Sequence, residues 1–394
     1  MISTDIAVIG AGPGGISAAI VLAQGGKDVT VIDQAQFPRE KYCGDGLTAS
    51  AIKSLDKLGL DTTQIKSWTP INRAILSSPK SSIATLDLSK GLMATATRYD
   101  LDSALVNLAK TKGIKVFEGC KFKGVLDPKS SSKIILDVEN LGQINCNYVI
   151  GADGMWSPTR KAFGVFEQQG YLGDWHAFRQ YFSNVSQDPN ELWVFFEPEI
   201  LPGYAWSFPV GEGKANVGFG IKRKSGQRSG EMKKTWNTLL ERSGIKQVLG
   251  KDAKACSVLR AWPIPTRITT TKLFARNGKV LFVGDAARAG DAMTGEGIAQ
   301  ALTTGHLAAM SILESEKHRS LLAHEIYYNA VRRYLGTGHS LTMVISKLLQ
   351  SPTGADLAVR GAGKPYISKR FSHWLFEDYP KTLVDIPRLW KQPK

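Results

Sequence analysis

The chain has 394 residues, of which 43% are hydrophobic and 22% charged, and its formal net charge at pH 7 is +15. This length is too great for one minimal domain, and the apolar fraction is enough for a sizeable buried core. No apolar run is long enough for a transmembrane helix, and the four scattered cysteines without a C-x-x-C pair exclude a zinc site or disulfide framework and suit a reducing cytosol.

The first 33 residues show the pattern strand, helix, strand. DIAVIG (5–10) is a short apolar run that ends at glycine, residues 13–25 carry small and aliphatic side chains at helical spacing, and DVTVID (28–33) is a second apolar run. This pattern predicts the start of a doubly wound parallel sheet. No basic stretch precedes the first apolar run, which therefore indicates a strand and not a signal peptide.

The middle of the chain differs in composition from both ends. Residues 176–221 contain four strand-like runs, HAFRQYFSNV, ELWVFFEP, GYAWSFPV and KANVGFGI, and predict an antiparallel sheet in a separate lobe. GKVLFVGDAA (278–287) returns to a buried parallel strand. Further strands are expected at 115–119, 133–138, 144–153 and 259–265, and helices at 97–113, 229–243 and 295–316, with a mostly helical tail from about 325.

Gly10, Gly12 and Gly15 form a G-x-G-x-x-G turn between the first strand and the first helix. Such glycines permit the tight turn, the close approach of a pyrophosphate and the packing of helix on strand, and the phosphates bind at the helix N-terminus. Asp33 stands at the end of the second strand, where a carboxylate holds a ribose 2′-hydroxyl. The site therefore favours FAD or NAD over NADP.

Two later stretches favour FAD. GADGMWSPTR (151–160) carries D-G-x-x-S-x-x-R, and VGDAARAGDAMTGEGI (283–298) carries G-D followed by G-E-G at the start of a helix. This set resembles the flavoproteins that include aromatic hydroxylases, flavin halogenases and geranylgeranyl reductases. The resemblance implies that Asp285 contacts the ribityl chain of FAD. It also implies that the helix start at 295–298 lies beside the flavin ring, where its dipole stabilises negative charge.

Arg98 matches an arginine that such proteins use near FAD, although an ion pair within its own helix would also explain it. The cofactor-binding residues expected from these motifs are Gly10, Gly12, Gly14, Gly15, Asp33, Arg39, Cys43, Gly44, Arg98, Asp153, Gly154, Asp285, Gly295, Gly297 and Ile298. No second G-x-G-x-x-G is present, so the electron donor stays open between NAD(P)H and ferredoxin. No metal ligands are expected.

The stretch LPGYAWSFPV (201–210) places Tyr204, Trp206 and Phe208 on one face of a strand. Rings of this size line either a core or an apolar pocket. The frame P-x-Y-x-W-x-F-P, however, resembles the signature of the geranylgeranyl reductase family, and FPREKYCGDGL (37–47) resembles that family's K-x-C-G-D-G loop. A flavin halogenase would instead show W-x-W-x-I-P. The family commonly has glycine where Arg288 stands and proline where Ala292 stands.

The resemblance implies an FAD-dependent reductase that saturates C=C bonds of a polyprenyl chain with hydride from the reduced flavin. An isolated C=C bond is not polarised, so we expect proton transfer to accompany hydride transfer and cation character to develop, which aromatic faces stabilise. Tyr204, Trp206 and Cys43 are the expected catalytic residues. Cys43 could also be an inert buried thiol, and the proton donor stays open among Cys43, Tyr204, Asp291 and water.

The substrate is not determined by the sequence. A polyprenyl quinone such as menaquinone, geranylgeranyl diphosphate and a prenylated glycerol lipid all fit. Two other functions compete with the reductase: an FAD-dependent monooxygenase or hydroxylase of an aromatic or lipid substrate, and a non-catalytic flavin-binding lipid carrier. The expected fold is α/β, with a Rossmann-type FAD-binding domain over 1–165 and 276–330, an antiparallel-sheet substrate domain over 166–275 and a helical segment over 331–394.

The positive charge is concentrated in two segments. Residues 214–279 hold 16 lysines and arginines against 3 acidic residues, and residues 360–394 hold 8 against 3. No nucleic-acid-binding motif accompanies them, so the candidates are a solvated basic face or an anionic membrane surface. The basic, aromatic tail suits a peripheral contact with a membrane, or packing against the body of the protein. We expect a cytoplasmic protein, peripheral at the inner face of the cell membrane.

Overall fold

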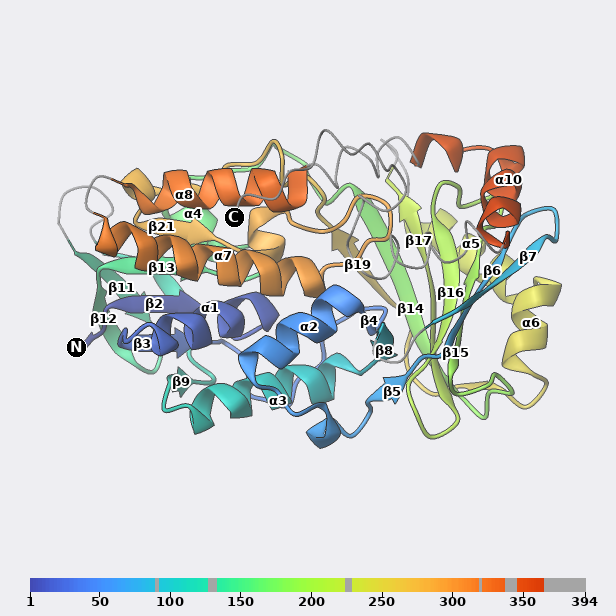
Figure 1. Ribbon diagram of the computed structural model, residues 1–394, viewed down its shortest axis with the longest axis horizontal. Coiled ribbons are helices and arrows are strands. Elements are labelled where there is room, and N and C mark those ends of the chain that lie inside the picture. The colour runs from blue at the N-terminus through green and yellow to red at the C-terminus, as the bar shows by residue number, and fades with distance from the viewer. Residues whose placement is uncertain (89–91, 127–132, 224–228, 319–320, 337–345, 365–394) are drawn as a thin grey trace.

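The computed structural model describes residues 1–88, 92–126, 133–223, 229–318, 321–336 and 346–364. Figure 1 shows two parts side by side, with a helix-covered parallel sheet at the left and a large antiparallel sheet at the right. The two parts correspond to the expected nucleotide-binding and sheet lobes, and the α/β class with a sheet-based second lobe is confirmed. The basic tail after residue 364 lies outside the described residues.

The left-hand part is built on a six-stranded sheet in the order β20-β21-β13-β2-β3-β9. Its strands are β2 (Ile6–Ile9), β3 (Val29–Ile32), β9 (Lys115–Phe117), β13 (Tyr148–Gly151), β20 (Phe274–Ala275) and β21 (Val280–Phe282). All neighbours are parallel except β20 and β21. Every residue of β2 and β3 is buried, because helices cover both faces of a parallel sheet, and this explains their unbroken apolar runs.

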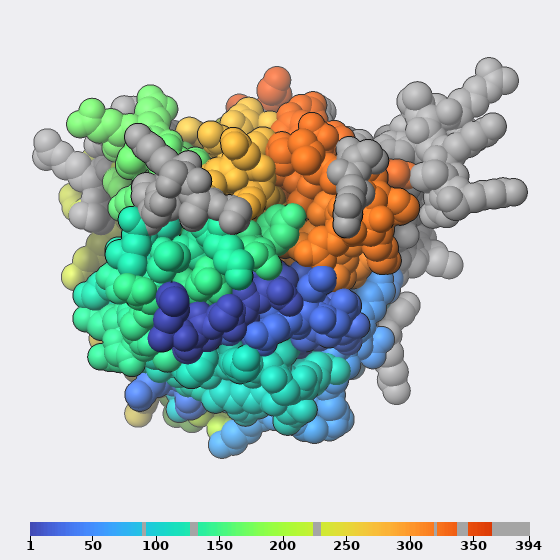
Figure 2. All heavy atoms as spheres, turned by 90° about the vertical axis from the view of Figure 1, so that its left-hand side faces the viewer, coloured from blue at the N-terminus to red at the C-terminus, as the bar shows by residue number. Residues whose placement is uncertain are grey.

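The helices that cover this sheet approach it and one another closely. They are α1 (Pro13–Gln24), α2 (Ala49–Leu58), α3 (Arg98–Thr111), α7 (Ile298–Lys317) and α8 (Ala323–Val331). A Cβ on Gly305 would lie 2.1 Å from the carbonyl oxygen of Gly14, so α1 and α7 meet backbone to backbone. Figure 2 views this end of the molecule, where the N-terminal residues in blue lie between α3 in teal and the orange helices.

A four-stranded sheet lies beside the six-stranded one, in the order β1-β12-β11-β10. Its strands are β1 (Ile2–Ser3), β10 (Phe122–Val125), β11 (Ile134–Val138) and β12 (Gly142–Cys146). The single strand expected over 144–153 is wrong, because β12 ends at Cys146 and β13 begins at Tyr148 in another sheet. The break follows from the hydrogen bonds of Asn147 and Tyr148, whose N–H groups both donate to Asp5 O.

The right-hand part is an eight-stranded sheet in the order β18-β14-β17-β16-β15-β6-β7, with β19 paired to β14. Its strands are β6 (Arg73–Ser77), β7 (Ile83–Asp87), β14 (Trp175–Ser183), β15 (Glu191–Phe195), β16 (Tyr204–Pro209), β17 (Lys214–Lys222), β18 (Lys254–Ala255) and β19 (Arg260–Ile264). The pairing crosses the boundary expected at residue 165, because β6 runs parallel to β15. The segment 73–87 therefore completes the sheet lobe although it precedes most of the nucleotide-binding half.

The remaining elements are short. A three-stranded sheet in the order β4-β8-β5 joins the two parts. These elements are β4 (Gly46–Thr48), β5 (Thr69–Pro70), β8 (Met93–Thr95), α4 (Pro158–Ala162), α5 (Ser229–Leu240), α6 (Ser243–Leu249), α10 (Pro352–Ala362) and the one-turn segments η1 (Thr62–Gln64), η2 (Arg276–Gly278), η3 (Gly284–Ala287) and η4 (Arg332–Gly336). None of the helices in the described residues is long and apolar enough to cross a bilayer.

Strand β16 separates two cores of the sheet lobe. Ala205 belongs to the cluster that packs under α5 and α6, whereas Trp206 and Phe208 belong to a cluster that includes Leu76 of β6 and Val359 of α10. The alternation expected for this strand is confirmed. Its large rings therefore point to the side of the sheet that faces the nucleotide-binding half.

Candidate active site

One cavity of about 640 Å³ runs from the glycine-rich turn of α1 to the inner face of the eight-stranded sheet. The expected site residues that line it are Gly10, Gly12, Gly14, Asp33, Arg39, Cys43, Gly44, Arg98, Asp153, Gly154, Tyr204, Trp206, Asp285, Gly295, Gly297 and Ile298. Among the expected residues Gly15 does not line it. Motifs up to 288 residues apart in the chain thus meet at one place, as the sequence predicted.

The glycine-rich turn has the shape that a pyrophosphate requires. Gly10 has a φ of +107°, and a Cβ there would lie 2.4 Å from Ala152 O. A Cβ on Gly15 would lie 1.9 Å from Gly10 O, so this glycine serves packing. A Cβ on Gly12, by contrast, would point into open space 3.8 Å from the guanidinium of Arg39. That space, between free helix N–H groups and a cation, fits the phosphates of a dinucleotide.

Asp33 lies at the end of β3, beside this turn. Its carboxylate accepts hydrogen bonds of 2.8 Å from the backbone N–H groups of Ala11 and Ala35. These bonds fix the carboxylate at the edge of the cavity. Each carboxylate oxygen keeps further lone pairs, so the expected contact with a ribose hydroxyl is compatible with them.

Two arginines share one buried carboxylate on the floor of the cavity. Arg98 donates from Nε and Nη2 to the two oxygens of Asp102, at 2.7 Å each, and Arg39 Nη2 lies 3.0 Å from Asp102 Oδ2. Burial opposes the charge on Arg98, but Asp102 more than offsets it and raises the pKa of Arg98. The local ion pair considered for Arg98 is thus real, and it holds both cations beside the glycine-rich turn.

Cys43 lies at the point where the nucleotide-binding and sheet lobes meet. Its side chain is partly buried and lines the cavity. Burial raises the pKa of the thiol, although the nearby Arg98 acts in the opposite direction. The thiol is therefore protonated at neutral pH, which suits a proton donor and not a nucleophile.

The buried carboxylate of Asp45 joins the Cys43 loop to the aromatic strand. Asp45 Oδ2 accepts hydrogen bonds from Tyr181 Oη at 2.5 Å and from Asn216 Nδ2 at 2.7 Å. Asn216 Nδ2 also donates to Cys43 O at 2.8 Å, and Asn216 Oδ1 accepts from Trp206 Nε1 at 3.1 Å. One asparagine thus fixes the Cys43 loop and Trp206 relative to each other. The carboxylate was expected to bind backbone amides, and that interpretation is wrong.

Sequence reasoning missed Asn216 and Tyr181. Asn216 is fully buried between Ala215 and Val217 of β17. A lone asparagine within an apolar strand was the available signal, because a buried amide must find polar partners. Tyr181 carried no such signal, since its partner lies 136 residues earlier in the chain.

Asp45 should make stability depend on pH. Burial raises its pKa from 3.8 to about 6, against the hydrogen bonds of Tyr181 and Asn216, which lower it. The folded state then binds the proton more tightly than the unfolded state, so stability is fully present below pH 3.8 and falls as pH rises to 6. The expected loss is about 3 kcal/mol. Asp45→Asn should remove this loss in urea unfolding at pH 4 and 7, and equal losses in both proteins would contradict it.

The rings of β16 form a continuous aromatic wall. Tyr204 and Trp206 have ring centroids 5.9 Å apart, and Trp206 and Phe208 6.1 Å apart. The hydroxyl of Tyr204 donates to Thr294 O in the loop before α7, which carries the G-E-G motif. Gly218 of β17 makes room for the indole, because a Cβ there would lie 2.4 Å from the Trp206 ring. The wall is therefore held against the loop expected to lie beside the flavin.

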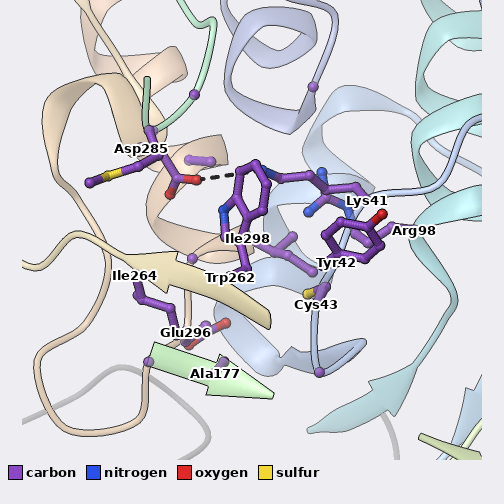
Figure 3. Close-up of a pocket in the computed structure, with 18 of the residues that line it drawn as sticks. Lys41, Tyr42, Cys43, Arg98, Ala177, Trp262, Ile264, Asp285, Glu296 and Ile298 are labelled. Atoms are coloured by element: carbon purple, nitrogen blue, oxygen red, sulfur yellow. Dashed lines mark ion pairs between the residues drawn. The ribbon is translucent and has the colours of Figure 1, made fainter. Parts of the chain in front are cut away.

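Lys41 and Trp262 extend the cavity wall toward β19. Lys41 Nζ lies 3.9 Å from Asp285 Oδ2 and 3.9 Å from the centroid of the Trp262 ring (Figure 3). Desolvation lowers the pKa of Lys41, although Asp285 opposes this. Asp285 is thus paired with a cation at the position where the resemblance implies a contact with the ribityl chain.

Three other residues singled out in the sequence serve local structure. Asp291 Oδ1 accepts from Met293 N at 2.9 Å and from Thr294 N at 2.7 Å, so it shapes the loop. Asp153 caps α4 by accepting from Thr159 N at 2.7 Å. Arg288 has a φ of +58°, a conformation that suits the glycine common in the resembled family. Its guanidinium is buried against Glu167 at 3.0 Å, which compensates for the backbone strain.

Comparison with known proteins agrees with this geometry. A family model described as FAD binding domain matches residues 3–332. A menaquinone reductase of Mycobacterium tuberculosis is 30% identical over 413 residues, which cover 99% of this chain and 95% of that protein. Digeranylgeranylglycerophospholipid reductase 1 of Methanopyrus kandleri is 29% identical over 315 residues, covering 79% of this chain and 80% of that protein. The chain belongs to the geranylgeranyl reductase family of FAD-dependent oxidoreductases.

Solved structures share the fold. A geranylgeranyl bacteriochlorophyll reductase-like protein from Thermoplasma acidophilum superposes with a TM-score of 0.81 at 23% identity, covering 99% of this chain and all of that one. The flavin-dependent halogenase CmlS gives 0.73 at 20% identity, covering 94% and 72%. The family establishes FAD as the cofactor and CH–CH groups as the target of this oxidoreductase. The glycine cradle and the Arg39 cation fit that cofactor.

Proposed function

We propose that this protein saturates C=C bonds in the chain of a polyprenyl lipid. The observation that supports it most is the continuity of the cavity, which joins the dinucleotide cradle to an apolar space on the aromatic wall. The apolar space is lined by Leu76, Met93, Leu192, Val194, Phe196, Pro202, Tyr204, Trp206, Phe208, Leu349, Ala358 and Val359. An uncharged hydrocarbon chain fits such a lining, whereas a small polar aromatic substrate would leave it largely unused.

The protein residues have distinct roles in this proposal. FAD, when bound, supplies the hydride. Tyr204 and Trp206 present aromatic faces to the reacting carbon and stabilise the positive charge that forms on it. The thiol of Cys43 is protonated and lies at the meeting point of the two parts, so it is the proton donor that we favour. Asp45 is a positioning residue, since it acts through Asn216.

Menaquinone is the first substrate to test. The relative that matches 99% of this chain is named menaquinone reductase, and other relatives are named digeranylgeranylglycerophospholipid reductases. We therefore propose the polyprenyl chain of a quinone as the substrate, with geranylgeranyl diphosphate and prenylated glycerol lipids as the alternatives. NAD(P)H and ferredoxin both remain proposed electron donors, and we propose a cytoplasmic protein that binds peripherally to an anionic membrane.

The deciding experiment is anaerobic turnover followed by mass spectrometry. The FAD-loaded protein is reduced with dithionite and mixed with menaquinone, geranylgeranyl diphosphate and a geranylgeranylated glycerol lipid in detergent. We expect menaquinone to gain two hydrogens for each bond reduced. A gain of one oxygen in air with NAD(P)H would support the monooxygenase instead, and unchanged lipids under every reductant would support a lipid carrier.

A further inference from the structure

Helix α10 closes the apolar end of the cavity. Ala358 and Val359 of this helix line the cavity, as does Leu349 just before it. The helix packs on β7, where Val359 shares a core with Ala84. It is also anchored by a buried hydrogen bond of 2.6 Å from Ser78 Oγ to Asp356 Oδ1. Figure 1 shows α10 at the upper right edge, outside β7.

The wall that α10 forms is only one residue thick. Leu348 is 50% exposed and Leu357 is 57% exposed, and each immediately precedes a residue that lines the cavity. Phe166 and Val258 are similarly exposed, at 74% and 61%, but neither is followed by a cavity-lining residue. The two leucines therefore mark the place where the inner apolar surface and the outer surface of the protein are closest.

The outer face of this segment is basic. Lys347, Arg360 and Lys364 are exposed, and Lys80 donates to Thr353 Oγ1 at 3.1 Å from the neighbouring turn. The single acidic residue in 346–364 is Asp356, which is buried against Ser78. Two exposed leucines among cations are the composition of a surface that lies in the interface of an anionic bilayer, with apolar side chains toward the acyl chains and cations at the phosphates.

We propose that the outer face of residues 346–364 docks on an anionic membrane and that the polyprenyl chain enters the cavity beside α10. This inference rests on the proposed function, because a polyprenyl lipid is dissolved in the bilayer and must leave it to reach the flavin. Docking by this face brings the thin wall against the acyl chains. The chain can then pass from one apolar medium to another without crossing water.

The test compares two double variants that change the charge equally. Leu348→Glu with Leu357→Glu places two acids on the proposed docking face, whereas Phe166→Glu with Val258→Glu places them elsewhere. FAD-loaded full-length proteins are floated with vesicles of phosphatidylglycerol and phosphatidylcholine, or of phosphatidylcholine alone. We expect the first variant to lose at least about tenfold in binding to anionic vesicles and the second to lose much less.

Turnover separates this inference from the proposed function. The Leu348→Glu, Leu357→Glu variant should reduce detergent-dissolved menaquinone at the wild-type rate but vesicle-embedded menaquinone about tenfold more slowly. Equal vesicle binding by both variants, or no wild-type binding to anionic vesicles, would overturn the docking face. Self-association seen by sedimentation in place of vesicle binding would also overturn it and indicate a contact between two copies. Flotation remains informative if no lipid is reduced, in which case the proposed function fails instead.

Discussion

Gly15→Ala is expected to abolish FAD binding. The new Cβ would lie 1.9 Å from Gly10 O, a backbone atom that cannot rotate away, and 3.1 Å from the Ala152 side chain. The start of α1 must therefore move away from β2, and the N–H groups that face the phosphates move with it. We expect the affinity for FAD to fall by at least about 100-fold. Flavin fluorescence during titration of the apoprotein measures the change.

Gly124→Ala is the matched control for this variant. No atom lies within 4 Å of the position where its Cβ would stand, so the same chemical change meets open space. We expect wild-type affinity for FAD in this variant and similar far-ultraviolet circular dichroism in both. If Gly15→Ala binds FAD as tightly as Gly124→Ala does, the close packing of α1 on β2 does not form the cradle.

Tyr204→Leu is expected to be much slower than Tyr204→Phe. Phenylalanine keeps the aromatic face and loses only the hydrogen bond to Thr294 O, so we expect a rate within about fivefold of the wild type. Leucine removes the face that stabilises the developing cation, and its reductive rate should be about tenfold lower than that of Tyr204→Phe. Single-turnover oxidation of the reduced flavin by saturating lipid measures both rates.

The flavin spectrum of each Tyr204 variant serves as the control, because an altered cofactor site would shift its absorbance bands. If Tyr204→Leu and Tyr204→Phe react at the same rate with unaltered spectra, the ring serves packing alone. The same comparison at Trp206 is less clean, because Trp206→Leu would also remove the donor to Asn216 Oδ1.

The parts of the fold that the sequence predicted are those whose signals are local. The apolar runs that became β2 and β3 are unbroken because helices cover both faces of a parallel sheet. The alternation in β16 is likewise a property of consecutive residues. The strand expected over 144–153 failed at Asn147, because the break depends on hydrogen bonds to Asp5, far away in the chain.

The candidate site divides in the same way. The glycine-rich turn, Asp33, the Cys43 loop and the G-E-G helix start could all be found from the sequence, since each motif has a spacing that one function requires. Their meeting in one cavity follows from the fold that these motifs share. Asp102, the shared partner of Arg98 and Arg39, gave no pattern of its own.

By itself, therefore, the sequence determined a flavin-binding fold, its phosphate cradle and an aromatic strand suited to a polyprenyl chain. Only the tertiary structure decided that β6 joins the sheet lobe, that Asp45 binds Asn216 across 171 residues of chain, and that α10 walls the apolar end of the cavity. The physical reason is that a turn or a strand alternation is set by neighbouring residues. The partner of a buried polar group, or the outer face of a wall, is set by segments that meet only when the whole chain has folded.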